Sequence, residues 1–228
     1  MAKKKITIAL TGNPNSGKTT VFNNLTGARQ HVGNWPGVTV EKKEGSLNYE
    51  GYDIKVVDLP GVYSLTAYSL DEVIARNFVV DEHPDVVVDI VDASNLERNL
   101  YLAVQLLEMG AKLVVALNMM DVAESRRYQI NVEELSRLLG APVVPLVANR
   151  NQGTQELLRT AVEVAKGNIE VAGLQLHYGR EVEEEISKLE SLISNNSLSS
   201  KYSPRWLAVK LLEEDEEIIK KFKELQVG

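Results

Sequence analysis

The sequence has 228 residues, of which 44% are hydrophobic and 25% are charged. This is the composition of an ordinary globular protein and excludes a disordered or fibrous chain. The absence of cysteine excludes disulfides, thiolate metal sites and a cysteine nucleophile. The net charge of −7 argues against a nucleic-acid-binding surface, because such surfaces neutralise phosphates with Lys and Arg. The apolar runs are far shorter than the roughly 20 residues of a membrane-spanning helix, so we expect this chain to be soluble.

Short apolar runs alternate with helical patterns over the first two thirds of the chain, which predicts an α/β fold with a mostly parallel central sheet. Several runs are rich in Val and Ile and apolar on both faces, as buried parallel strands are. Residues 41–49 alternate more and meet the next run across Glu50-Gly51, which predicts one antiparallel strand at the sheet edge. The expected parallel strands are residues 6–10, 52–58, 86–92, 113–118 and 143–146.

Helices are expected between these strands and should flank the sheet. Ser69 with Glu72 and Asn131 with Glu134 have the spacing of a capping box, and Gly110 stands where a left-handed helix end belongs. The expected helices are residues 18–26, 70–80, 96–109, 132–139 and 155–164.

The last part of the chain has a different character, which predicts a first domain of residues 1–167 and a small all-helical subdomain of residues 168–228. Apolar side chains recur at spacings of four, three and four between Val182 and Ile193, which is one face of a helix. From residue 167 onward there are 8 basic and 12 acidic side chains, so this tail is acidic.

Residues 12–19 read GNPNSGKT, which fits G-x-x-x-x-G-K-[ST] between an expected strand and an expected helix. This context predicts a phosphate-binding loop, whose glycines let backbone N–H groups turn toward phosphates at the positive end of a helix. Lys18 is expected to reach the β- and γ-phosphates, and Thr19 to offer its hydroxyl to Mg²⁺. The loop residues expected to contact the ligand are Gly12, Asn13, Asn15, Ser16, Gly17, Lys18, Thr19 and Thr20.

Two later segments are candidates to complete the phosphate and metal site. Asp58 ends an expected strand and opens Asp-Leu-Pro-Gly, so we expect it to bind Mg²⁺ through water and the Gly61 N–H to contact the γ-phosphate. Residues 29–40, the switch segment, contain glycines and a proline and resemble a mobile switch, in which Thr39 is the candidate second hydroxyl ligand of Mg²⁺. The alternatives are an ordinary Asp-x-Pro-Gly turn for Asp58 and a solvated strand-edge residue for Thr39.

The base is indicated by Asn118-Met119-Met120-Asp121, which follows a buried strand. The Asp121 carboxylate can accept hydrogen bonds from guanine N1–H and from its exocyclic amine, a pair that adenine lacks. Alone, this pattern is often only a capping turn, but the order of phosphate loop, Asp-x-x-Gly and Asn-x-x-Asp is that of the GTPases. GTP and GDP are therefore the expected ligands. Val62 stands where Ras-like enzymes have the glutamine that orients water, which predicts slow intrinsic turnover.

Together these motifs closely resemble the cytosolic amino-terminal part of the ferrous iron transport protein B family. The resemblance covers most of residues 6–121 and is carried by GNPNSGKTTVFNNLTG, VGNWPGVTVEKKEG, DLPGVYSL, YSLDEVIAR, VDASNLERNLYL and NMMD. It implies a P-loop GTPase fold, a helical domain that restrains GDP release, and a polytopic membrane domain, absent from this chain, that moves Fe²⁺. It also implies a place at the cytoplasmic face of the cell membrane and self-association through the membrane protein.

The resemblance implies further site residues. Related GTPases with asparagine at the position of Asn15 hold K⁺ beside the phosphates, so potassium-stimulated hydrolysis is expected; the alternative is an asparagine that suits the turn. Val147-Ala148-Asn149 is a loose version of the family's Ser-Ala loop, which makes Ala148 and Asn149 candidate base contacts together with Met119. The residues expected to act in catalysis are Lys18, Asn15, Thr39 and Gly61.

Two other classes of function remain open from the sequence. A ribosome-assembly or RNA-modification GTPase would share the phosphate loop and Asn15, but such proteins attach a basic RNA-binding module and this tail is acidic, so no nucleic-acid partner is expected. A nucleotide-dependent interaction module with negligible turnover is the second class. His31, His83 and His177 are scattered along the chain and are expected at the surface, not in an iron site.

Overall fold

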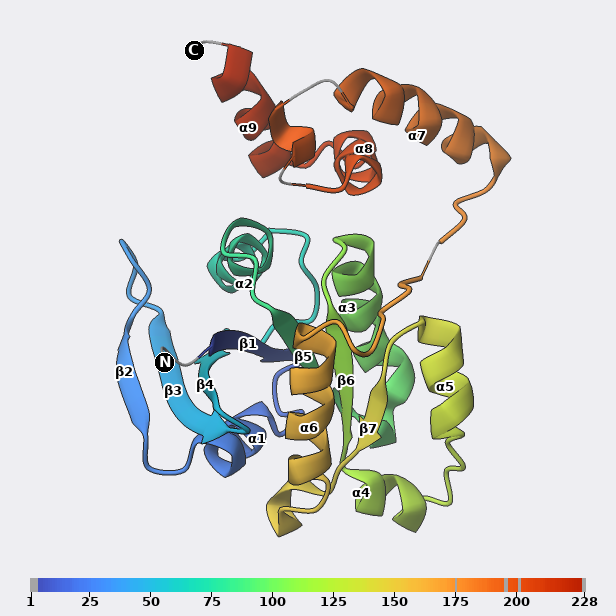
Figure 1. Cartoon of the computed structure of the whole chain (residues 1–228). Helices are drawn as coiled ribbons and strands as arrows, with labels where there is room; N and C mark the ends of the chain where they lie inside the picture. Colours follow the sequence, from blue (N-terminus) through green and yellow to red (C-terminus); the bar gives the residue numbers. More distant parts are fainter. Residues whose placement is uncertain (1–3, 175, 195–196, 201, 227–228) are drawn as a thin grey trace.

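The computed structural model describes residues 4–174, 176–194, 197–200 and 202–226. In this part of the chain, seven strands form one sheet in the order β2-β3-β4-β1-β5-β6-β7 (Figure 1). The pairs from β4 to β7 are parallel, and β3 is antiparallel to both of its neighbours. The strands are β1 Lys4–Gly12, β2 Gln30–Asn34, β3 Glu41–Tyr49, β4 Tyr52–Asp58, β5 Val86–Asp92, β6 Leu113–Asn118 and β7 Val143–Pro145.

Helices cover both faces of the sheet because its central strands are apolar on both faces. On β5, Val87 and Val91 belong to the core under α2 and α3, whereas Val88 and Ile90 belong to the core over α1 and α6. The predicted α/β fold with a mostly parallel sheet is confirmed. Its helices are α1 Lys18–Thr26, α2 Leu70–Asp81, α3 Leu96–Glu108, α4 Met120–Ser125, α5 Val132–Leu139 and α6 Thr154–Ala165, with 3₁₀ turns η1 Ala93–Asn95 and η2 Ala148–Arg150.

The predicted helix starts are confirmed by their hydrogen bonds. The Ser69 hydroxyl accepts from the Glu72 N–H at 3.2 Å, and the Glu72 carboxylate accepts from the Ser69 N–H at 3.3 Å, which is a complete capping box. The Asn131 side chain accepts from the Glu134 N–H at 3.0 Å at the start of α5. Each such cap stabilises its helix by about 1 kcal/mol.

Two elements were not predicted. Strand β2 lies inside the switch segment, and the antiparallel strand β3 is therefore not the edge strand of the sheet. All five residues of β2 are exposed, so no apolar alternation marks it; it forms because its backbone pairs with β3. Helix α4 is short and follows Asn118 directly, where the sequence pattern indicated only a base-binding loop.

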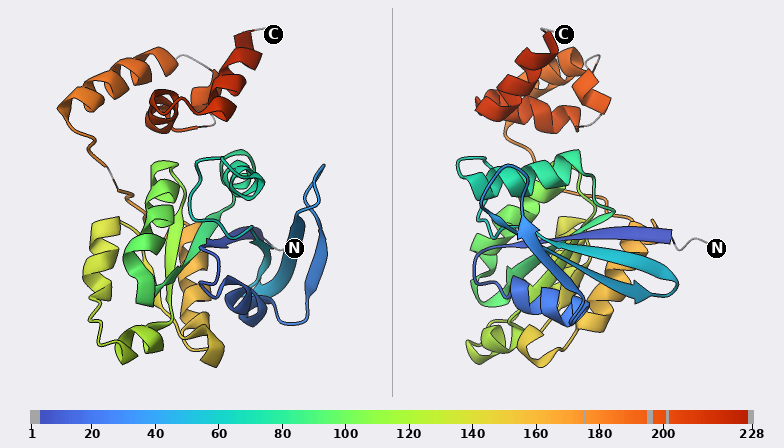
Figure 2. Two further views of the ribbon diagram at one scale, coloured as in Figure 1. Left: turned by 180° about the vertical axis from the view of Figure 1, so that it is seen from behind. Right: turned by 90° about the vertical axis from the view of Figure 1, so that its left-hand side faces the viewer.

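The end of the chain is helical, as predicted, with α7 Arg180–Ile193, η3 Ser197–Ser200, α8 Pro204–Leu212 and α9 Glu216–Gln226. These helices share a small core in which Ile186, Trp206, Leu207 and Ile218 are buried together with Val80 of α2. The tail therefore packs against α2 and the end of α3 and is set apart from the sheet (Figure 2). None of the helices in the described part of the chain is long and apolar enough to cross a membrane.

Candidate functional site

The predicted phosphate loop joins β1 to α1 in a tight turn. Asn15 and Gly17 have positive φ angles of 67° and 92°, and the Ser16 N–H donates to the Asn13 carbonyl at 3.1 Å. A Cβ added to Gly17 would lie 2.3 Å from Asn118 Nδ2, so glycine is required there. Among the described residues no side chain caps the start of α1. The first N–H groups of this helix and the positive end of its dipole are thus available to an anion.

Lys18 and Asp58 meet at this loop although 40 residues separate them. The Lys18 ammonium donates to Asp58 Oδ1, and the two side chains are only 12% and 8% exposed. Asp58 is held at the end of β4, where the next residue, Leu59, donates its N–H to the Leu10 carbonyl at 2.9 Å. The ion pair therefore places an ammonium group and a carboxylate together beside the phosphate loop.

The segment after Asp58 lies against the phosphate loop. The Val62 N–H donates to the Gly12 carbonyl at 3.2 Å, and a Cβ added to Gly61 would lie 3.5 Å from the Cα of Pro14. This contact brings the Gly61 backbone beside the phosphate loop.

Thr39 does not join these residues in the structure. It is exposed and, in the described part of the chain, its side chain makes no hydrogen bond. The loop that carries it packs on α2 through Trp35, whose ring lies 5.6 Å from that of Phe78, with the Lys42 ammonium 4.7 Å from the Trp35 ring. Thr39 is therefore carried by a loop that is anchored on α2 through Trp35.

Asn118 connects three segments around the candidate base site. Its Nδ2 donates to the Ser16 carbonyl at 2.9 Å, and its Oδ1 accepts from the Ala148 N–H at 3.0 Å. The side chain is buried, with 3% of the residue exposed, so both bonds are shielded from water. The end of β6 thus fixes the phosphate loop and the loop that follows β7 at the same time.

Asp121 and its neighbours lie at the same edge of the sheet. Met119 has a positive φ of 61°, which turns the chain from β6 into α4. The Asp121 carboxylate accepts from the Val122 N–H at 3.0 Å, lies 3.6 Å from Arg150 and is 24% exposed. Asn149 is exposed in η2. Asp121 therefore keeps acceptor capacity that faces solvent, as a base-reading carboxylate requires.

The oxygen donors at the loop suit the metal ions that the sequence analysis expects. Thr19 is exposed at the start of α1 and follows Lys18, which pairs with the buried Asp58 carboxylate. Hydroxyl and carboxylate oxygens are ligands that Mg²⁺ prefers. The Asn15 side chain is exposed beside the phosphate loop and can offer an amide oxygen to K⁺. Within the described residues the buried Asn13 amide and Ser16 hydroxyl have no hydrogen-bond partner, so the loop has polar capacity that a ligand could use.

A second network joins α2 to the helical tail. The Arg76 guanidinium on α2 donates to the carboxylate of Asp215, a residue between α8 and α9, at 2.5 Å. The two side chains are only 1% and 5% exposed. The Tyr202 hydroxyl donates to Asp81 at 2.6 Å, and the pKa of Tyr202 is raised by burial and by this bond. The tail therefore contacts α2, which is the next helix in the chain after the segment that lies on the phosphate loop.

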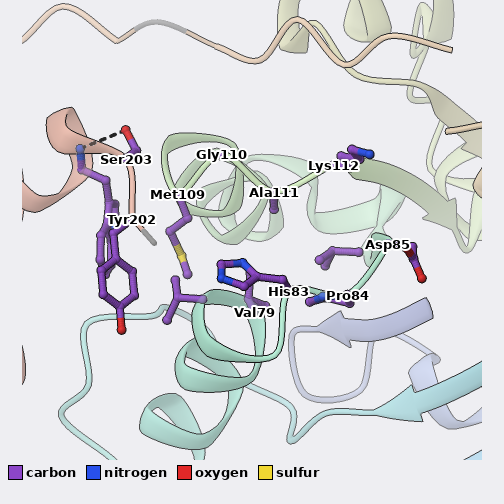
Figure 3. A pocket seen from close by; sticks show the side chains of 13 residues that line it. Val79, His83, Pro84, Asp85, Met109, Gly110, Ala111, Lys112, Tyr202 and Ser203 are labelled. Carbon is purple, nitrogen blue, oxygen red and sulfur yellow. Dashed lines mark hydrogen bonds between the residues drawn. The ribbon is translucent and has the colours of Figure 1, made fainter. Parts of the chain in front are cut away.

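A cleft of about 450 Å³ separates the tail from the ends of α2 and α3 (Figure 3). His83, Asp85 and Lys112 lie along one side of it and Tyr202 and Ser203 along the other. Asp85 and Lys112 precede β5 and β6, so the cleft lies at the edge of the sheet opposite to the phosphate loop. It is therefore separate from the candidate nucleotide site.

Some functional contacts could not be found from sequence patterns. Asn24, which contacts the loop after β7, and the partners Arg76 and Asp215 carry no local motif, because each pair is brought together only by the fold. The three histidines, His31, His83 and His177, are exposed, as predicted for surface residues.

Comparison with known protein families shows which family this chain resembles. Residues 6–161 match the model for ferrous iron transport protein B, and residues 178–227 match that for the FeoB cytosolic helical domain. The Fe(2+) transporter FeoB of Escherichia coli K12 is 48% identical over 93% of this chain. The match spans only 27% of that transporter's length.

Solved structures agree with this result. The cytosolic domain of the T. maritima FeoB iron transporter in a GDP form is 42% identical, with a TM-score of 0.91 over 97% of this chain and 86% of that one. The same domain in a GMPPNP form is 42% identical, with a TM-score of 0.90 over 96% and 86%. The chain therefore belongs to the ferrous iron transport protein B family, with its GTPase domain and its cytosolic helical domain.

Proposed function

We propose that this chain binds and hydrolyses GTP and acts as the regulatory switch of a ferrous iron transporter, while a membrane domain outside this chain moves Fe²⁺. The observation that carries the proposal is the arrangement around Asn118, which joins the phosphate loop to the Ala148 loop, while Asp58 and Gly61 lie against the same phosphate loop. The relatives named as Fe(2+) transporters and the T. maritima domain in GDP and GMPPNP forms support the same function.

The nucleotide would lie along the edge of the sheet from the phosphate loop to α4. Asp121 would accept from guanine N1–H and the exocyclic amine, with Met119, Ala148 and Asn149 around the base. The phosphates would lie on the N–H groups of the loop from Gly12 to Thr20, with the Lys18 ammonium on the β- and γ-phosphates.

Two ions fit this site as cofactors. Thr19, Thr39 and Asp58 would hold Mg²⁺, which when bound neutralises charge on the β- and γ-phosphates. Thr39 belongs to the loop that Trp35 anchors on α2, so its part in this set depends on how that loop lies when nucleotide is bound. Asn15 would offer its side-chain oxygen to K⁺, which when bound supplies positive charge near the bond that breaks.

The conformation of the helical tail would depend on which nucleotide is bound. Residues 1–167 form the GTPase domain and residues 168–228 the helical subdomain, which restrains GDP release through its contacts with α2. The whole protein would sit at the cytoplasmic face of the cell membrane and could self-associate through its membrane domain. Membership of this family and the acidic tail favour this function over that of an RNA-modification or ribosome-assembly GTPase.

GTP hydrolysis is expected to be faster in KCl than in NaCl at matched ionic strength, and Asn15→Ala is expected to remove the difference. Negative charge develops at the β–γ bridge during phosphoryl transfer, and an arginine placed there in other GTPases contributes about 10³ to 10⁵ in rate. Arg29, at the start of the switch segment, is poorly placed for that role, so a cation held by Asn15 would replace the arginine. Phosphate release measures the rates.

The controls for this experiment separate the ion from the nucleotide. Asn15→Gly suits the positive φ at this position and should behave as Asn15→Ala does. Lys18→Ala should abolish turnover in both salts. Equal parent rates in KCl and NaCl would contradict the role of potassium, and a parent without GTP turnover in either salt would contradict the proposed GTPase activity.

Asp215→Asn is expected to speed GDP release several-fold, because it leaves the Arg76 guanidinium buried without its counter-charge and weakens the attachment of the tail to α2. Removing one partner of a buried ion pair costs about 3 to 5 kcal/mol. Stopped-flow chase of a fluorescent GDP analogue measures the release. Glu185→Gln, which breaks an exposed ion pair with Lys188 in the same tail, is the control and should leave the rate unchanged. Release at the parent rate from Asp215→Asn would argue against the restraint.

A further inference from the structure

The loop after β7 is held from two sides at a single residue. The Ala148 N–H donates to Asn118 Oδ1 at 3.0 Å, and the Ala148 carbonyl accepts from Asn24 Nδ2 at 2.8 Å. Asn118 belongs to β6 and Asn24 to α1, so the two bonds come from different elements. The backbone of Ala148 is thus fixed in both position and orientation by two side-chain amides.

Apart from the ion pair of Arg150 with Asp121 at 3.6 Å, the other hydrogen bonds of this loop in the described part of the chain are within the loop itself. Val147 and Gln152 exchange backbone hydrogen bonds of 3.2 Å in both directions, and the Asn151 N–H donates to the Ala148 carbonyl at 3.0 Å. These bonds set the shape of residues 147–152 but do not determine where the loop stands relative to the phosphate loop. The hydrogen bonds that hold the backbone of this loop to other elements are those of Asn118 and Asn24, beside the packing of the buried Ala148 in the core.

The two amides close a ring with the phosphate loop. Asn118 also donates to the Ser16 carbonyl at 2.9 Å, and Asn24 lies on α1, the helix that continues the phosphate loop. A displacement of the Ala148 loop would therefore stretch its bond to Asn24 on α1 and its bond to Asn118, which in turn holds the Ser16 carbonyl of the phosphate loop. The part of the site for the base and the part for the phosphates are coupled through this ring.

We infer that Asn24 is a positioning residue for guanine-nucleotide retention, because it locks the Ala148 loop against the base from the phosphate-binding helix. This inference rests on the proposed nucleotide site. Asn24 does not touch the reacting phosphates; it acts through the backbone of Ala148. Its loss should therefore weaken nucleotide binding and leave the chemical step unchanged.

The structure offers a matched control on the adjacent residue. Asn23 is exposed, and within the described residues its side chain accepts only from Gln30, at 2.9 Å, and makes no hydrogen bond to the Ala148 loop. Asn23→Ala and Asn24→Ala make the same chemical change in the same helix, and alanine raises helix propensity at both positions. Asn24→Asp keeps the shape of the side chain but replaces the amide donor with an acceptor that repels the Ala148 carbonyl.

The test compares GDP release, GTP turnover and melting temperature for these variants of the full chain. Asn24→Ala is expected to release a fluorescent GDP analogue about 3 to 10 times faster than the parent, as the loss of one net hydrogen bond predicts. Asn24→Asp should release it at least as fast. Both should raise KM for GTP, with kcat and melting temperature close to those of the parent, and Asn23→Ala should match the parent in every measurement.

Two results would overturn the inference. GDP release at the parent rate from both Asn24 variants would show that Ala148 is held without Asn24. A fall in kcat and melting temperature with unchanged KM would assign Asn24 a purely structural role. If the parent itself does not bind GDP, the proposed function fails first, so the two failures are distinguishable.

Discussion

Replacing Asp121 with Asn is expected to move nucleotide preference from guanine toward xanthine by as much as about 10⁴ to 10⁵ in relative affinity. The carboxylate would accept from guanine N1–H and the exocyclic amine, whereas an amide presents a donor where xanthine carries a carbonyl. The change is large because a wrong partner leaves buried polar groups of the base unpaired. In the structure the carboxylate is 24% exposed, and its nearest cation, Arg150, lies 3.6 Å away at the surface.

Competition titrations with GDP and XDP against the parent and Asp121→Asn measure this preference. Glu124→Gln removes an exposed carboxylate from the same short helix α4 and should leave the preference unchanged. Undiminished GDP affinity in Asp121→Asn would show that the base is read elsewhere. Loss of both nucleotides with a normal melting temperature would also count against base reading, because xanthine binding should rise.

Much of the fold follows from patterns that act locally in the sequence. The predicted bounds of strands β4, β5 and β6 coincide with those in the structure, because apolar runs of this kind fit best in the buried centre of a parallel sheet. Strand β2 escaped prediction because its sequence, QHVGN, is exposed on both faces and is a strand only through pairing with β3. Helix α4 was not predicted because its six residues are too few to show the periodicity of a helix.

In the candidate site, too, local motifs could be predicted from the sequence and long-range contacts could not. The phosphate loop was predictable because its chemistry requires glycine and lysine at fixed spacing within eight residues. The hydrogen bond from Asn118 to the Ser16 carbonyl joins residues 102 positions apart, and that from Asn24 to the Ala148 carbonyl joins residues 124 positions apart. Sequence motifs relate residues over much shorter distances, so they could not predict these bonds. The docking of Trp35 on Phe78 was likewise invisible, since it depends on how β2 and β3 place the loop over α2.

Asp89 is a residue whose protonation state is determined by its place in the fold. It lies in the centre of β5, beside Thr11 of β1 and Val115 of β6, and is 1% exposed. Within the described part of the chain neither carboxylate oxygen has a hydrogen-bond partner, and the Thr11 hydroxyl has none either. Burial alone raises the pKa of Asp89 from 3.8 to about 8. At neutral pH the side chain is therefore expected to be a protonated, uncharged acid.

This protonation should make the fold less stable as the pH rises. Between about pH 4 and pH 8 the folded state keeps a proton that the unfolded chain has lost, so the free energy of unfolding should fall by up to about 1.4 kcal/mol per pH unit and level off above pH 8. The contribution is complete below pH 4, where both states are protonated. Asp89→Asn, which cannot ionise, should remove this slope whatever its effect on absolute stability.

Urea unfolding of the parent and of Asp89→Asn from pH 5 to pH 9 measures the two slopes. Only the difference between the two slopes is informative, because the other titrating groups are the same in both proteins. The buried amide of Asp89→Asn, which has no hydrogen-bond partner, lowers the free energy of unfolding by an amount that does not depend on pH. Glu82→Gln, which removes an exposed carboxylate at the end of α2, should keep the parent's slope. Parallel curves for the parent and Asp89→Asn would mean that Asp89 is ionised in the folded protein, and a cation or water must then reach it inside the sheet.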